Sequence, residues 1–229
     1  MKHSGKASLA ALKLAGLGLA ALLALLAAAY LGMVIGAFVL HYLTWVLISL
    51  WALFTAFTFY FFRDPDPMTP TGANLVVAPG HGTVDVIDTT TETDFMGGEC
   101  RRVSMFLSVL NIHVQNAPVT GRVAFFKHTP GQYLNAMKTD SARFNENILM
   151  GFDCAEPHGE KIGVRLIAGM IARRIVPWVA QADAVQRGER ISLIQFGSRV
   201  DVYLPMRAKI RVNPGDKVKG GETVIASIG

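Results

Sequence analysis

The sequence predicts an α+β protein in which a helical membrane anchor at the N-terminus precedes a β-rich, sandwich-like domain. Apolar residues make up 51% of the 229 residues and charged residues only 17%, a composition too apolar for a chain that lies wholly in water. The charge is also uneven, because the first acidic residue is Asp64 and residues 1–62 carry only three lysines. We therefore expect an anchor over residues 1–62 and a folded domain over residues 63–229.

The anchor is an uncharged run from Leu14 to Phe62, about twice the ~20 residues that one helical crossing needs. It predicts a helical hairpin with spans near residues 10–30 and 43–62, joined by a turn within 32–41. Basic residues flank both ends, so a hairpin would put both ends, and the domain that follows, on the cytoplasmic side of the cell membrane. A single span or a peripheral attachment is the alternative.

The domain over residues 63–229 is predicted to be rich in β-strands. Pro65, Pro67 and Pro70 exclude a continuous helix at its start, and short alternating apolar segments separated by Gly and Pro turns follow. The closing segment, VNPGDKVKGGETVIASI (212–228), resembles the last strands of biotinyl and lipoyl domains. A barrel-sandwich-hybrid-like arrangement is therefore expected.

Charge and cysteine usage exclude several function classes. Residues 63–229 hold 19 of the 22 basic residues and all 17 acidic ones, so no basic stripe remains to bind nucleic acid. Cys100 and Cys154 are far apart and lack the spacing of metal ligands. We expect no nucleic-acid partner, no metal site and no disulfide.

The most specific local feature is the pair Gly197-Ser198, which interrupts an otherwise continuous strand pattern from Ile191 to Leu204. Glycine inside a strand marks a bulge or a close approach of the backbone. A kink here would expose the Gly197 carbonyl to the Ser198 hydroxyl, although the pair alone also fits an ordinary turn.

Four segments, in order, resemble the phosphatidylserine decarboxylase family, and most of all its short, membrane-anchored bacterial and archaeal type. The resemblance runs from about residue 60 to the end of the chain. The segments are FFRDPD (61–66), MFLSVLNIHVQNAPVTGRV (105–123), IAGMIARRI (167–175) and GERISLIQFGSRVDVYLP (188–205).

The resemblance implies a proenzyme that cleaves itself. The Ser198 hydroxyl attacks the Gly197 carbonyl to form an ester, and β-elimination then separates a large chain, 1–197, from a small chain, 198–229. Residue 198 is left as a dehydroalanine that hydrolyses to a pyruvoyl group. That group is the implied cofactor, an electron sink for converting phosphatidylserine to phosphatidylethanolamine and CO2. The implied partners are phosphatidylserine in the membrane and the two chains themselves, as a heterodimer.

Two histidines complete the implied site. His113 matches the family histidine that activates the serine and later transfers a proton, and an ordinary pKa of about 6.5 suits that role. His81 stands where the family usually has the aspartate of a Pro-Ala-Asp-Gly turn, so the expected orienting carboxylate is missing. His81 could pair with His113, Asp85 could reach it, or water could bridge the gap. Loss of the carboxylate is expected to slow self-processing.

Three alternatives stay open at this point. The substrate could be a related serine-headed lipid such as archaetidylserine. The chain could instead be a membrane-anchored β-sandwich adaptor without catalysis, or a homologue that has lost self-processing because His81 replaces aspartate. The last two predict a single uncut chain of 24.8 kDa.

Overall fold

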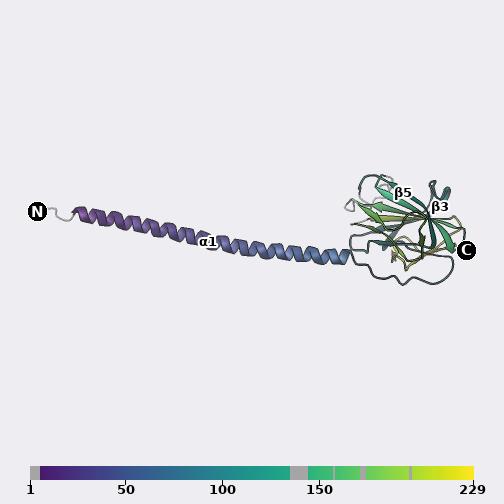
Figure 1. The fold of residues 1–229 in the computed structure, drawn as a ribbon, viewed down its shortest axis with the longest axis horizontal. Helices are drawn as coiled ribbons and strands as arrows, with labels where there is room; N and C mark the ends of the chain where they lie inside the picture. The colour runs from purple at the N-terminus through teal and green to yellow at the C-terminus, as the bar shows by residue number, and fades with distance from the viewer. Residues whose placement is uncertain (1–5, 135–143, 157, 171–173, 196–197) are drawn as a thin grey trace. The chain divides into compact units, whose positions relative to one another are not determined.

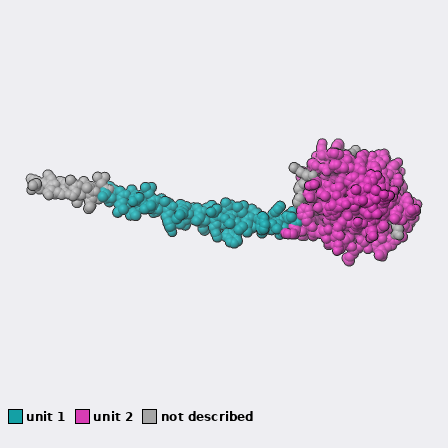
Figure 2. All heavy atoms as spheres, in the orientation of Figure 1, with its two compact units in different colours: residues 1–58 teal, residues 59–229 magenta. Residues whose placement is uncertain are grey.

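The computed structural model describes residues 6–134, 144–156, 158–170, 174–195 and 198–229. The chain divides into two compact units, residues 1–58 and residues 59–229, which Figure 2 distinguishes by colour. The boundary lies four residues before the one that the charge pattern predicts.

One continuous helix, α1 (Lys6–Phe61), occupies 56 residues where a hairpin of two helices is expected (Figure 1). The expectation of a turn within 32–41 is corrected, because the helix runs through that segment. The physical reason is that the segment contains Gly32 and Gly36 but no proline. A glycine costs only about 1 kcal/mol in a helix, and the leucines and alanines around it favour the helix.

Residues Ala15–Phe61 of α1 are long and apolar enough to cross a membrane, with a mean hydropathy of 2.4. Large apolar side chains are exposed along its described part, a pattern typical of a helix that lies in lipid. At 1.5 Å per residue these 47 residues extend about 70 Å. The helix ends where Asp64-Pro65 follows, because a residue that precedes proline disfavours helical geometry.

The second unit is built from antiparallel strands, which together with α1 confirms the predicted α+β class (Figure 1). Eight strands form one sheet in the order β13-β2-β3-β11-β7-β6-β5-β9, and two three-stranded sheets have the orders β1-β14-β12 and β4-β10-β8. The strands are β1 (Leu75–Val77), β2 (Gly82–Glu92), β3 (Gly98–Leu107), β4 (Val114–Asn116), β5 (Thr120–Thr129), β6 (Asn147–Glu156), β7 (Lys161–Ala168), β8 (Ile175–Pro177), β9 (Ala184–Val185), β10 (Arg190–Ile194), β11 (Ser198–Leu204), β12 (Lys209–Ile210), β13 (Lys217–Val218) and β14 (Val224–Ser227).

The middle of the large sheet places Ser198 at the end of a buried row of side chains. Val200 and Val202 of β11 lie opposite buried residues on both neighbouring strands, β3 and β7. In the same register Ser198 lies between Leu107 and Ala168, which are also fully buried. Because paired residues in an antiparallel sheet point to the same face, the Ser198 side chain faces the core.

The predicted interruption of the strand pattern is present in the structure. β10 ends at Ile194 in a three-stranded sheet, and β11 begins at Ser198 in the eight-stranded sheet. The chain thus changes sheets between these two residues. Gly197, the other half of the predicted cleavage site, lies outside the described residues.

Candidate active site

Ser198 has an unusual environment for a hydroxyl group. Its side chain is fully buried, and its Oγ has no hydrogen-bond partner among the residues that the structure describes. Buried polar atoms are nearly always paired, because an unpaired one costs about 1–3 kcal/mol. This unpaired hydroxyl, at the first residue of a strand, marks Ser198 as a candidate for chemistry rather than for structure.

His113 closes the loop between β3 and β4. Asn111 shapes this loop, since its Oδ1 accepts a hydrogen bond from the Ser108 N–H at 2.9 Å. The Asn111 carbonyl oxygen lies 2.9 Å from Nδ1 of His113. A carbonyl oxygen can only accept, so Nδ1 carries the proton in the neutral ring and Nε2 is the unprotonated nitrogen. The loop therefore presents Nε2 as the basic nitrogen.

The surroundings of His113 keep its ring neutral at pH 7. The pKa of His113 is lowered from 6.5 to about 4, chiefly by burial; the hydrogen bond to Asn111 opposes this shift, and the charges of Arg63 and His81 add to it. A neutral imidazole is the form that accepts a proton. His113 is thus in its base form throughout the physiological pH range.

Two connections bring the His113 loop to the same end of the domain as Ser198. The loop leaves β3 at Leu107, which pairs with Ser198 across the sheet. On its other side, the Ile194 N–H donates to the His113 carbonyl at 3.1 Å, four residues before Ser198. The serine and the histidine that the sequence singled out therefore lie at the same end of the domain.

His81 lies in the turn between β1 and β2 and is half-buried. Burial lowers its pKa, an effect that the Glu222 charge opposes and the Arg63 charge reinforces. Its imidazole lies against the backbone at Gly220, where an added Cβ would be 3.1 Å from His81 Nε2. His81 acts on His113 through charge, and it lowers rather than raises the pKa of His113.

The structure gives Asp85 a different role from the one considered for it. Both carboxylate oxygens of Asp85 bind the guanidinium of Arg199, with Oδ1 to Nη1 at 2.9 Å. Arg199 is fully buried, so Asp85 supplies its counter-charge. The idea that Asp85 orients His113 is therefore corrected: the Asn111 carbonyl binds Nδ1. In the sequence, only the position of Asn111, two residues before His113, could have indicated this contact.

A cationic hollow of about 430 Å³ adjoins the His113 loop. Its lining includes Asn111 and three basic side chains that come from well-separated parts of the chain, Arg63, Lys217 and Lys219. His81 also lines it. Such a lining attracts anionic groups.

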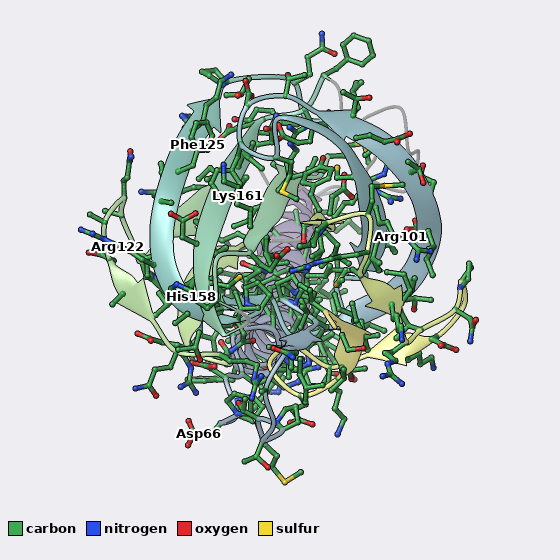
Figure 3. The ribbon with its side chains drawn as sticks, turned by 90° about the vertical axis from the view of Figure 1, so that its right-hand side faces the viewer. Asp66, Arg101, Arg122, Phe125, His158 and Lys161 are labelled. Carbon is green, nitrogen blue, oxygen red and sulfur yellow. The ribbon has the colours of Figure 1, made fainter. Side chains whose placement is uncertain are left out.

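A second hollow, of about 560 Å³, lies at the opposite end of the large sheet. It is lined by Arg122, Cys154 and His158, among others, and Figure 3 labels Arg122 and His158. Asn147, at the start of β6, pairs with Ile167 near the Ser198 end, whereas Cys154 lies seven residues farther along the same strand. This hollow is therefore remote from Ser198. Among the described residues, no group of three His, Cys, Asp or Glu side chains is arranged to hold a metal ion.

Replacing His81 with aspartate tests the electrostatic role of that position. A negative charge would raise the pKa of His113, where His81 lowers it, and would make His113 a stronger base. We expect His81→Asp to speed self-cleavage several-fold at pH 7.5, measured by following a pulse-labelled chain on gels. His158→Asp, on the exposed β6–β7 turn, is the control and should not change the rate. An unchanged or slower rate in His81→Asp would contradict this account.

Comparisons with known proteins define first a class and then a family. A buried serine hydroxyl without a partner among the described residues, a neutral histidine and a cationic hollow are features typical of an enzyme active site, on a chain whose helix is long and apolar enough to cross a membrane. The family model for phosphatidylserine decarboxylase matches residues 54–226. The chain belongs to the phosphatidylserine decarboxylase family.

Curated relatives agree with the family match. The phosphatidylserine decarboxylase proenzyme of Desulfotalea psychrophila is 42% identical over 183 residues, which cover 80% of this chain and 85% of the relative. The proenzyme of the same name from Syntrophus aciditrophicus is 40% identical over 173 residues, which cover 76% of this chain and 80% of the relative. The resemblance that the sequence segments suggested is therefore confirmed.

Proposed function

We propose that this chain converts phosphatidylserine to phosphatidylethanolamine and CO2, with a pyruvoyl group that it makes from its own Ser198. The observation that carries the proposal is the buried Ser198 hydroxyl without a hydrogen-bond partner among the described residues. It lies where the chain passes from one sheet to another, in a member of a family whose curated relatives are named proenzymes.

Self-cleavage begins at the Ser198 hydroxyl. Nε2 of His113 accepts the hydroxyl proton as Oγ attacks the carbonyl carbon of residue 197, and the peptide bond is exchanged for an ester. Removal of the α-proton of residue 198 then expels the carboxylate of the 1–197 chain. The dehydroalanine left behind takes up water and releases ammonia, which leaves a keto group at the head of the 198–229 chain. The peptide nitrogen of residue 198 thus leaves as ammonia.

The pyruvoyl group fits the place that Ser198 occupies. Leu107 and Ala168 flank this position and are fully buried, so they keep water from it. The group supplies an electron sink for the carbon–carbon bond that breaks when CO2 leaves. His113 can hold a proton at Nε2 and deliver it to the substrate carbon, because Nδ1 stays bound to Asn111.

The surface around the site suits an anionic lipid. The phosphate and carboxylate of phosphatidylserine match the cationic hollow beside His113. Leu110 and Met170 are 58% and 59% exposed, and each lies within three residues of a neighbour of Ser198, Leu107 or Ala168. Exposed apolar side chains beside a site let it work at the surface of a bilayer.

The membrane location and the two-chain form belong to the same proposal. The apolar segment Ala15–Phe61 holds the enzyme at the cell membrane, with the domain on the cytoplasmic side. A diacyl lipid leaves a bilayer slowly, so an anchored enzyme meets its substrate by lateral diffusion. After cleavage the large and small chains stay together as a heterodimer.

Mass spectrometry of the purified chain tests the proposal. We expect two fragments, residues 1–197 and 198–229, the second with a keto group that reacts with hydroxylamine. Ser198→Ala should give one intact chain of 24.8 kDa that releases no CO2 from phosphatidylserine vesicles. Ser227→Ala, at the end of β14, is the control and should cleave normally.

An intact wild-type chain would overturn the proposal. If His81→Asp then restored cleavage, the chain would be a homologue impaired in processing, whereas continued absence of cleavage would favour the adaptor. A cleaved chain that acts only on archaetidylserine would retain the chemistry and change the substrate.

A further inference from the structure

The last residue of α1, Phe61, packs directly on His113. Phe61 belongs to the second unit and is fully buried, whereas Phe59, Tyr60 and Phe62 around it are exposed. The Phe61 and His113 rings are stacked, with centroids 4.3 Å apart and an angle of 29° between their planes. Phe61 is the buried ring of an otherwise exposed turn, and it is buried against the candidate base, His113.

The end of α1 is also tied to the loop that carries His113. Arg63 donates from Nη1 to the Tyr60 carbonyl at 2.6 Å and from Nη2 to the Leu110 carbonyl at 2.7 Å. The Tyr60 hydroxyl donates to the same Leu110 carbonyl at 3.3 Å, and the Arg63 guanidinium lies 3.9 Å from the centre of the Tyr60 ring. These bonds fix the last turn of the helix against the 108–113 loop.

We propose that Phe61 is a positioning residue for catalysis: it forms one wall of the site, fixes the plane of the His113 ring and keeps water from it. This inference rests on the proposed role of His113 as the base in self-cleavage. The Asn111 carbonyl fixes which nitrogen carries the proton, and the Phe61 ring lies against one face of the imidazole. A stacked ring at this distance restricts rotation of the imidazole out of its plane and so helps to set the direction of Nε2.

Among the described residues, a small set of groups bears on the protonation of His113. Arg63, which follows the helix, and His81, in the β1–β2 turn, are the charged or titratable groups that act on it, and both lower its pKa. The loop contributes the Asn111 carbonyl, and β10 contributes the Ile194 N–H to the His113 main chain. Burial is the largest influence, and Phe61 covers one face of the ring. Removing the Phe61 ring should therefore let the pKa rise toward 6.5.

The pH dependence of self-cleavage in the full-length chain tests the inference. The chain is pulse-labelled during cell-free synthesis with lipid vesicles and chased between pH 5 and pH 8. For Phe61→Ala we expect the loss of rate on the acidic side of the pH–rate profile to begin at higher pH. The rate at pH 5 should then fall by up to about 30-fold relative to the rate at pH 8. Phe61→Leu should shift the acidic side of the profile in the same direction, by a smaller amount. Phe61→Tyr, which keeps a stacking ring, should restore the wild-type profile, and Phe59→Ala, on the exposed face, should match wild type.

A direct titration separates this inference from the proposed function. The Ser198→Ala chain with labelled histidines is titrated by NMR, with and without Phe61→Leu, so that cleavage plays no part. The His113 midpoint is expected to be higher in the double variant. An unchanged midpoint together with an unchanged cleavage profile would refute the role of Phe61, even if wild type cleaves normally. Failure of the wild-type chain to cleave would instead refute the proposed function, and the titration would still decide whether Phe61 controls His113.

Discussion

Replacement of His113 with glutamine is expected to slow self-cleavage by roughly 10²- to 10⁴-fold, the usual contribution of a general base. Glutamine fills much of the buried space and can still bind the Asn111 carbonyl, but it has no basic nitrogen. The Ser198 hydroxyl would then have no strong acceptor for its proton. The measurement is the half-life of the pulse-labelled full-length chain at pH 7.5, where the wild-type ring is neutral.

The matched control is His128→Gln. The His128 side chain is 47% exposed, and its Nε2 lies 3.2 Å from Oε1 of Glu146. Its replacement should leave the half-life within about twofold of wild type, as for a surface change without catalytic contacts. If His113→Gln cleaved as fast as His128→Gln, His113 would not be the base.

Replacement of Asp85 with asparagine is expected to lower the free energy of unfolding by about 3 kcal/mol. The Arg199 side chain is 1% exposed, and the exchange would leave its charge buried without the carboxylate that now binds both terminal nitrogens. The measurement is urea unfolding of the detergent-solubilised chain. Ser198→Ala serves as the background, so that every sample is a single polypeptide.

An exposed ion pair provides the comparison for this variant. Asp94 binds Lys127 at 2.8 Å, and their side chains are 38% and 48% exposed. Asp94→Asn should therefore cost less than about 1 kcal/mol. Equal losses in Asp85→Asn and Asp94→Asn would show that the Asp85–Arg199 pair contributes no more than a surface contact.

The parts of this protein that could be predicted from the sequence are those set by local patterns. The change from an uncharged run to short alternating segments marks the α+β organisation. The glycine and serine at 197 and 198 mark the end of one strand pattern and the start of the next, and the structure begins β11 at Ser198. His113 was singled out as a candidate through the family resemblance of its segment, since a lone histidine carries no specific signal.

The parts that could not be predicted depend on contacts between distant residues. Asp85 and Arg199 meet only because β2, β3 and β11 are adjacent in the large sheet. Phe61 lies 52 positions before His113, and nothing in an apolar run shows which of its aromatic rings is buried. The turn within α1 was wrongly expected because an apolar run of this length fits two short spans as well as one long helix.

The position of β11 in the large sheet determines whether the protein could refold after cleavage. This strand lies between β3 and β7, and β12, β13 and β14, which follow it, pair with β14, β2 and β1. A cut before Ser198 would turn a unimolecular folding problem into a bimolecular one, because the 32-residue peptide supplies an interior strand. Once melted and diluted, such a nicked protein would not regain its fold at a useful rate. Only the newly made, unbroken polypeptide would assemble the architecture, and maturation would then be a one-way step.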